Sequence, residues 1–178
     1  MFCRVIAHNR QMNCILFLDF DGVMHPDPSP KKSFFCQLPL IEEVLREQPQ
    51  VEIVVSSSWR YDHKLPELQA FFLPDIRHLV IDITPTVART DDEGWIPPHL
   101  LQHHREWECR KWLRQHRNGD TPWLAIDDVS EWFVPDCEHL LVTRSELGFQ
   151  SAQVSILREM LKTRTGMDSS RKNGEDRT

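Results

Sequence analysis

Apolar runs alternate with amphipathic segments along most of this chain. Short apolar runs next to turn residues predict strands at residues 14–20, 51–55, 79–83, 123–126 and 140–142. Between and after them, apolar residues three and four positions apart predict helices at residues 39–47, 65–72, 106–117 and 151–162. This alternation predicts an α/β fold with a mainly parallel sheet that helices cover.

The first predicted strand ends in two carboxylates. Asp19 and Asp21 follow the apolar run 14–18, and Gly22 comes directly after them. Ligands of parallel sheets bind just beyond the carboxyl ends of the strands, and residues i and i+2 of a strand share a face. Both acids are therefore placed to converge on one metal ion or one phosphoryl group, while Gly22 lets the backbone turn away. Paired acids in this position suit metal-assisted phosphoryl chemistry.

Two other predicted strands also end in polar residues. Ser56, Ser57 and Ser58 follow residues 51–55, and Asp127 and Asp128 follow residues 123–126. On its own, an Asp-x-Asp pair is equally compatible with a turn that carries solvated acids. Together with Ser56 and Asp127, it favours an active site at one edge of the sheet.

These motifs resemble those of the haloacid dehalogenase (HAD) superfamily of phosphohydrolases. Asp19 and Asp21 match its first motif, Ser56 its second, and Asp127 with Asp128 its fourth. More narrowly, residues 56–60 (SSSWR), 83–85 and 105–113 look like the HAD domain found alone or in multifunctional RNA repair proteins. The resemblance covers residues 13–161 and implies a Rossmann-like, three-layer α/β/α sandwich.

The resemblance implies a covalent mechanism with Asp19 as the nucleophile. Asp19 would attack phosphorus and form an aspartyl-phosphate, which splits one difficult displacement into two easier ones. Asp21 would protonate the leaving oxygen and then accept a proton from the attacking water. Mg²⁺ suits such a site because it prefers a few carboxylates, water and substrate phosphate. Its expected ligands are Asp19, the backbone carbonyl of Asp21, and Asp127, with Asp128 holding a metal-bound water.

Further residues are candidates for contacts with the transferred phosphate. The Ser56 hydroxyl and nearby backbone N–H groups, around Gly22 and Ser57, would hold the phosphoryl oxygens. The resemblance places a Lys or Arg at the start of the helix before the fourth motif, and Arg105 is the best match. Arg60 suits a phosphate contact and a structural ion pair equally well.

Purely structural roles are the alternative for the residues around the second motif. Ser57 and Ser58 are more typical of turn or helix-capping positions than of catalysts. Trp59 is more typical of a packing anchor than of a platform for base stacking, because aromatic side chains mostly contribute buried area.

The spacing of the motifs leaves no room for a full cap domain. A short flap at residues 25–35 and one helix fit between the first two motifs, and a helix, a strand and a loop at residues 89–102 precede Arg105. The resulting open site admits large substrates such as phosphorylated nucleic-acid ends. Basic residues on helix 106–117 would guide a polyanion or form a solvated face balanced by acids; these residues are Arg110, Lys111, Arg114 and Arg117.

Composition is compatible with this prediction. The 178 residues suffice for one domain, expected at residues 13–162 between a non-core leader at 1–12 and a disordered tail at 163–178. The five cysteines lack CxxC spacing and are expected to be reduced thiols of a cytoplasmic protein. No apolar run approaches a membrane span. The net charge of −6 argues against a broadly basic nucleic-acid surface.

We therefore expect a Mg²⁺-dependent phosphomonoesterase that favours nucleotide or nucleic-acid terminal phosphates. The alternatives are a phosphatase for small metabolites and a domain that binds phosphate groups or a partner protein without turnover. A pure binder gains nothing from a nucleophile and an acid two residues apart, which disfavours the last alternative.

Overall fold

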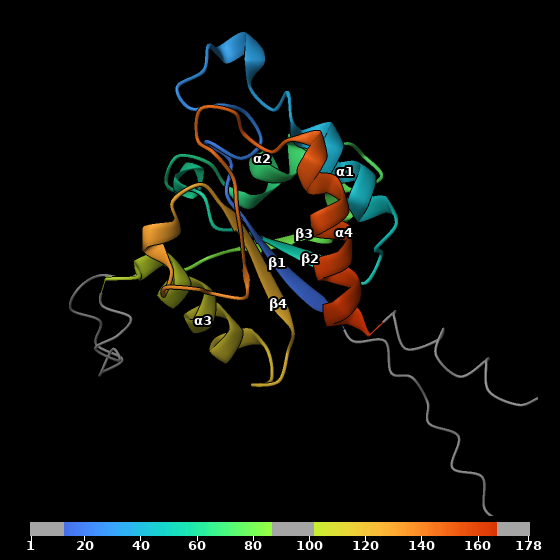
Figure 1. The fold of residues 1–178 in the computed structure, drawn as a ribbon, viewed down its shortest axis with the longest axis vertical. Helices are drawn as coiled ribbons and strands as arrows, with labels where there is room; N and C mark the ends of the chain where they lie inside the picture. Colours follow the sequence, from blue (N-terminus) through green and yellow to red (C-terminus); the bar gives the residue numbers. More distant parts are fainter. Residues whose placement is uncertain (1–12, 87–101, 167–178) are drawn as a thin grey trace, which may run out of the picture.

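The computed structural model describes residues 13–86 and 102–166, and a sheet lies at their centre (Figure 1). Within these residues, five parallel strands pair in the order β3-β2-β1-β4-β5. They are β1 (Cys14–Leu18), β2 (Val51–Val55), β3 (Val80–Ile83), β4 (Trp123–Asp127) and β5 (Leu140–Val142). The predicted α/β fold with a parallel sheet is confirmed.

Helices cover both faces of the sheet. They are α1 (Leu38–Arg46), α2 (Leu65–Ala70), α3 (His104–His116) and α4 (Ser151–Thr165), with short 3₁₀ turns at η1 (Lys31–Ser33), η2 (Ser58–Tyr61), η3 (Arg77–Leu79) and η5 (Ser130–Trp132). Apolar residues of α1, α2 and α4 pack on one face, and Cys109 and Trp112 of α3 pack on the other. The result is a three-layer sandwich (Figure 1).

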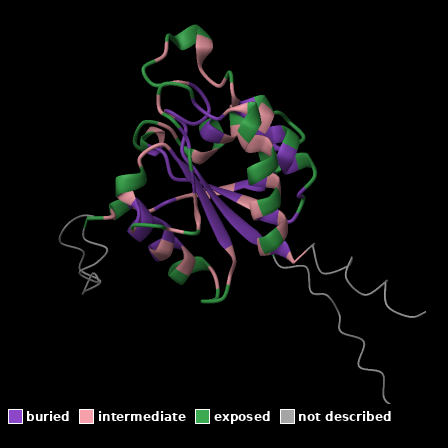
Figure 2. Cartoon of the chain, viewed as in Figure 1, coloured by how far each residue is buried: buried purple, intermediate pink, exposed green. Residues whose placement is uncertain are grey.

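Strand β1 forms the middle of the core, and all five of its residues are buried (Figure 2). Successive strand residues point to opposite faces. Leu16 and Leu18 accordingly contact the α1 and α4 side, whereas Ile15 and Phe17 contact the α3 side. The apolar run at the start of the chain is continuous because neither face of this strand meets water.

The predicted ends of several elements are wrong by a few residues. The first strand ends at Leu18 instead of residue 20, because the chain turns at Phe20, whose carbonyl accepts the N–H groups of Val23 and Met24. The last helix extends three residues beyond the predicted end, through Thr165, and stops at Gly166 in the left-handed conformation. Residues 163–165 are therefore helical and do not belong to a disordered tail.

Three predicted segments lie wholly or largely outside the described residues: the leader at 1–12, the loop at 89–102 and the tail from 167 onward. Between β1 and β2 the chain forms the expected flap and α1, with no separate domain in this described stretch. Among the residues that the structure describes, no helix is both long enough and apolar enough to cross a membrane.

Candidate active site

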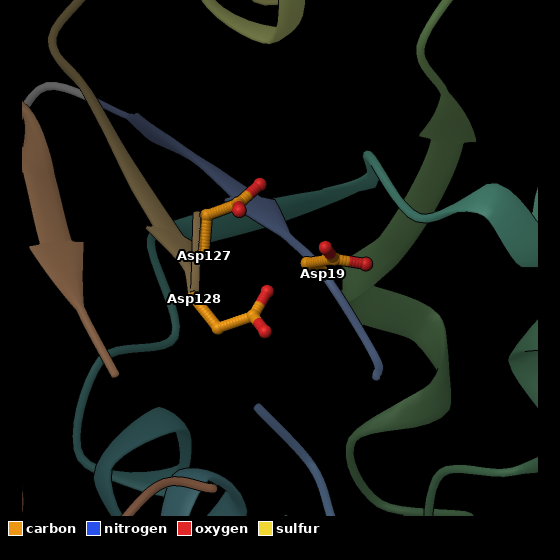
Figure 3. A group of neighbouring side chains, drawn as sticks. All are labelled: Asp19, Asp127 and Asp128. Atoms are coloured by element: carbon orange, nitrogen blue, oxygen red, sulfur yellow. The ribbon is translucent and has the colours of Figure 1, made fainter. Parts of the chain in front are cut away.

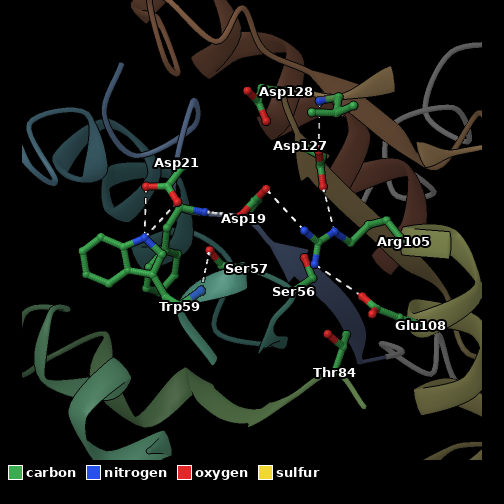
Figure 4. Close-up of polar contacts among 12 residues, drawn as sticks. Asp19, Asp21, Ser56, Ser57, Trp59, Thr84, Arg105, Glu108, Asp127 and Asp128 are labelled. Carbon is green, nitrogen blue, oxygen red and sulfur yellow. Dashed lines mark hydrogen bonds and ion pairs between the residues drawn. The ribbon is translucent and has the colours of Figure 1, made fainter. Parts of the chain in front are cut away.

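The parallel register brings the predicted site residues to one edge of the sheet. Leu18 is paired with Val55 of β2 and with Ile126 of β4. The next residue of each chain segment is Asp19, Ser56 or Asp127, so the three lie side by side (Figure 4). Backbone hydrogen bonds continue the alignment, from Asp19 N–H to the Ile126 carbonyl at 3.1 Å and from Ser56 N–H to the Leu18 carbonyl at 3.0 Å.

Three carboxylates form a candidate metal site. Asp19, Asp127 and Asp128 each offer an oxygen that lies within 4.8 Å of the other two (Figure 3). Oδ1 of Asp127 accepts the Val129 N–H at 2.9 Å, but its buried Oδ2 has no hydrogen-bond partner among the described residues. The Ser145 hydroxyl donates to Asp128 Oδ2 at 2.6 Å. A buried carboxylate oxygen that accepts no hydrogen bond, within a group of acids, fits a divalent cation with oxygen ligands.

The Arg105 side chain lies between the acids of the first and fourth motifs. Its Nη2 is 3.8 Å from Asp19 Oδ2, and its Nε is 3.3 Å from Asp127 Oδ2 (Figure 4). A third carboxylate, that of Glu108 one helical turn later, is 3.3 Å from Arg105 Nη1. The guanidinium also packs over the Trp132 ring. Arg105 is therefore in direct contact with the acids of both motifs, and its contact with a phosphoryl group stays a prediction.

Burial makes it unfavourable for both buried acids to be ionised. It raises the pKa of Asp19 to about 6, against the opposing charge of Arg105. Burial also raises the pKa of Asp127 to about 8, and the neighbouring charge of Asp19 adds to this effect. Two carboxylates that share one cation cannot both hold a full charge at neutral pH without additional positive charge. The site is therefore electrostatically short of positive charge, which a metal ion would supply.

The structure assigns Arg60 to an ion-pair network, one of the two alternatives that the sequence left open. Its Nη2 is 2.7 Å from Glu108 Oε1, and its Nη1 donates to the carbonyls of Ser57 and Ser56 at 2.7 and 3.2 Å. Only 3% of the Arg60 side chain is exposed. Since Glu108 also contacts Arg105, Arg60 supports the active-site cation, and its expected contact with substrate phosphate is not supported.

The Asp21 carboxylate is turned away from the three acids and toward the indole of Trp59 (Figure 4). Trp59 Nε1 lies 3.0 and 2.9 Å from its two oxygens, and His25 Nε2 lies 3.1 Å from Oδ1. These hydrogen bonds, with that of His25 the largest influence, hold the pKa of Asp21 below its ordinary value of 3.8. Asp21 thus stands apart from the carboxylate cluster, and its backbone carbonyl remains its predicted metal ligand.

Position 22 requires a glycine, because of its backbone conformation and because there is no room for a side chain. Its φ of +65° lies in the left-handed region, and a Cβ at this position would be 2.2 Å from Asp128 Oδ2. The Thr143 hydroxyl donates to its carbonyl at 2.7 Å. The predicted turn is present, and the absent side chain leaves room for the Asp128 carboxylate.

The two remaining second-motif candidates are both buried. The hydroxyl of Ser57 accepts the Trp59 N–H at 3.4 Å as the cap of η2, as the capping alternative expects, and it also hydrogen-bonds to Asp19. Ser56 is 1% exposed beside Asp19 and Arg105 (Figure 4). Contacts of Ser56, Ser57 and Gly22 with a phosphate remain predictions.

Several site residues have no sequence signal. Thr143 and Ser145 reach the site from the segment after β5, and His25 reaches it from the start of the flap. The contact of Glu108 with Arg105 could have been predicted, because residues three positions apart on a helix can touch.

The comparison with protein families agrees with this geometry. A family model described as the HAD domain in Swiss Army Knife RNA repair proteins matches residues 15–154, which include every site residue described above and the whole sheet except Cys14, the first residue of β1. No curated protein and no solved structure matched the chain. Since the match spans most of the sequence and contains the sheet with its polar edge, the chain belongs to the family of HAD domains of Swiss Army Knife RNA repair proteins.

Proposed function

We propose that this domain is a Mg²⁺-dependent phosphomonoesterase that acts through a phosphorylated Asp19 on terminal phosphates of nucleotides or nucleic acids. One observation carries the proposal: the buried Asp19 carboxylate lies 3.8 Å from the Arg105 guanidinium and beside two further acids. A nucleophile, a cation for the phosphoryl oxygens and a set of metal ligands are thus within one small space.

Asp19, Asp127 and Asp128 would hold the metal ion, together with the backbone carbonyl of Asp21. Two observations support this assignment: Asp127 Oδ2 accepts no hydrogen bond and has only its ion-pair contact with Arg105 among the described residues, and the pKa values of the two buried acids are raised. When bound, Mg²⁺ would neutralise the charge of the carboxylates and of the phosphoryl oxygens.

The side chains of this domain would divide the reaction into two displacements. In the first, an Asp19 oxygen forms a bond to phosphorus, the bond to the leaving oxygen breaks, and Asp21 donates a proton to that oxygen. In the second, Asp21 takes a proton from water, the water oxygen attacks phosphorus, and phosphate leaves with Asp19 regenerated. Arg105 and the Ser56 hydroxyl would hold the phosphoryl oxygens, where charge is greatest in both steps.

The family and the open flank of the site support a nucleic-acid end as the substrate. No folded cap follows β1 in the described chain, and the family is named for RNA repair proteins. Two of the basic residues of α3 are less accessible to a nucleic acid than the sequence suggests. Lys111 is buried, and Arg110 lies 2.7 Å from Glu106. Arg114 is exposed on the same helix, with its guanidinium over the Trp107 ring, and is the basic residue of α3 that would meet a longer chain.

A turnover screen tests the proposal. The purified protein would be incubated with Mg²⁺ or with EDTA and offered an aryl phosphate, nucleoside monophosphates, and oligonucleotides with a 5′ or a 3′ phosphate. We expect phosphate release that requires Mg²⁺, is abolished by Asp19→Asn and is retained by the control Asp120→Asn, whose side chain is exposed in the loop before β4. Absence of turnover on every substrate would favour the binding domain, and turnover of small substrates alone would favour the metabolite phosphatase.

A further inference from the structure

Two aromatic rings hold the carboxylate of Asp21 from one side. The indole nitrogen of Trp59 can only donate a hydrogen bond, and it lies about equally far from both Asp21 oxygens, at 3.0 and 2.9 Å. The imidazole Nε2 of His25 lies 3.1 Å from Oδ1. A carboxylate with both oxygens engaged in this way has one preferred orientation.

The surroundings of His25 decide which of its nitrogens carries the proton. Its Nδ1 accepts the backbone N–H of Phe35 at 3.5 Å, so the neutral ring carries its hydrogen on Nε2 and donates it to Asp21. Only 1% of the His25 side chain is exposed. The same bond from Phe35 closes the base of the loop at residues 26–34, which makes the ring part of a fixed framework.

Packing also fixes both rings. The His25 ring lies 4.6 Å from that of Phe34, and the Trp59 ring lies between 5.3 and 5.8 Å from those of Phe20, Phe35, His63 and Phe71, among others. Aromatic contacts at these distances are favourable and resist rotation of each ring. The two donors therefore cannot follow Asp21 to another orientation, and Asp21 keeps both bonds only where it now lies.

One side of the Asp21 carboxyl remains open. Its side chain is 38% exposed, although His25 beneath it is buried. Oδ1 accepts from both rings and Oδ2 accepts from Trp59, and the Ser58 side chain also hydrogen-bonds to this carboxylate, which still has lone-pair capacity for one further partner. Proton transfer requires an oxygen within hydrogen-bond distance of the reacting atom and correctly directed.

From this geometry we infer that Trp59 and His25 are positioning residues for Asp21, which orient its carboxyl for proton transfer with the leaving oxygen and the attacking water. The inference rests on the proposed phosphomonoesterase activity, in which Asp21 is the acid and base. It gives a specific role to the tryptophan of the segment SSSWR, which the sequence assigned only to packing or base stacking.

The Trp59→Phe variant tests the inference, because it removes the N–H donor and keeps a ring in the cluster. The readout is kcat/KM for an aryl phosphate and for a simple alkyl phosphate, because a poor alkoxide leaving group needs the proton and an acidic phenol does not. We expect a loss of about 10- to 100-fold for the alkyl phosphate, as for other small misplacements of catalytic groups, and a much smaller loss for the aryl phosphate. His25→Leu should behave in the same way, and His25→Gln, which restores an N–H donor, should recover part of the loss.

Two controls separate positioning from damage to the fold. Trp112→Phe removes an indole bond to another acid, Asp82, at 2.7 Å on the outer strand β3, and should affect both substrates alike. In an Asp21→Asn background, Trp59→Phe should have no further effect on alkyl phosphate turnover, because the group that it orients is already disabled.

The possible outcomes are distinguishable. A wild type that releases phosphate from neither substrate overturns the proposed function and this inference with it. If the wild type is active, any one of three results overturns the inference alone. Trp59→Phe lowers kcat/KM equally for both substrates, it leaves kcat/KM unchanged, or it still lowers kcat/KM in the Asp21→Asn background.

Discussion

The Asp127→Asn variant should be more stable than the wild type when no metal is bound. The Asp127 side chain is 0% exposed, and its Oδ2 has no hydrogen-bond partner in the part of the chain that the structure describes. Asp19 offers a second carboxylate within 4.8 Å. Asparagine has nearly the same shape as a protonated aspartate, so it fits this position without the negative charge.

The magnitude follows from the pKa of the folded chain. Burial raises the pKa of Asp127 from 3.8 to about 8, so at pH 7 the folded state holds a proton that the unfolded state has released. The corresponding stability is fully present below pH 3.8 and is lost as the pH rises through the folded pKa. At about 1.4 kcal/mol per pKa unit, the loss at pH 7 reaches about 4 kcal/mol. Asp127→Asn removes this loss. After any new strain beside Arg105 is subtracted, the free energy of unfolding of the variant should be about 1 to 4 kcal/mol higher than that of the wild type.

Thermal unfolding in EDTA at pH 5 and pH 7.5 measures this effect. Each kcal/mol corresponds to about 2–4 °C in Tm for a chain of this size. The gap between variant and wild type should widen at the higher pH, and the exposed control Asp120→Asn should show no such gap. With Mg²⁺ the wild type should gain stability and Asp127→Asn should gain less. A variant that is less stable than the wild type in EDTA at pH 7.5, or a gap that does not grow with pH, would refute the reasoning.

Two further predictions concern the turn and the basic helix. Gly22→Ala should lower both Tm and Mg²⁺ affinity, because the new methyl group meets Asp128 Oδ2. The control Gly166→Ala, at φ +73° and with no atom within 4 Å of the new methyl group, should lower Tm alone. Equal Mg²⁺ affinities of the two variants would contradict this prediction. Arg114→Gln should reduce kcat/KM for phosphorylated oligonucleotides, most at low salt, and leave an aryl phosphate unaffected, because Arg114 lies about 14 Å along α3 from Arg105. Arg158→Gln on α4 is the control for the loss of one positive charge, and it also removes ion pairs with Glu47 and Glu43. An equal effect of both variants on the oligonucleotide would argue against a nucleic-acid path along α3.

The core of the site could be predicted because it depends on a local rule. A parallel sheet aligns the ends of its strands, so the residues that follow adjacent strands meet without further information. Asp19, Ser56 and Asp127 are of this kind, and the register of β1 with β2 and β4 places them together. Arg105 needed the family resemblance as well, since several basic residues share its helix.

The supporting contacts could not be predicted, because they depend on tertiary packing. Ser145 reaches Asp128 across 17 positions of the chain, and Trp59 reaches Asp21 across 38. The residue type of Trp59 indicated a buried ring, but the direction of its N–H depends on the turn of η2 and on the surrounding rings. His25 gave no signal, since a histidine near a turn is unremarkable until its partner is known.

The central place of β1 in the sheet also determines when the site can exist. The strand that carries Asp19 pairs with β4, whose residues lie more than 100 positions later in the chain, as the pairing of Ile15 with Trp123 shows. During synthesis, the nucleophile is therefore made early, but its neighbours Arg105 and Asp127 emerge much later. A growing or truncated chain that ends before β4 carries the first motif and lacks the acids that complete the metal site. Catalytic competence, on the proposed mechanism, is thus a property of the finished sheet and arrives with it.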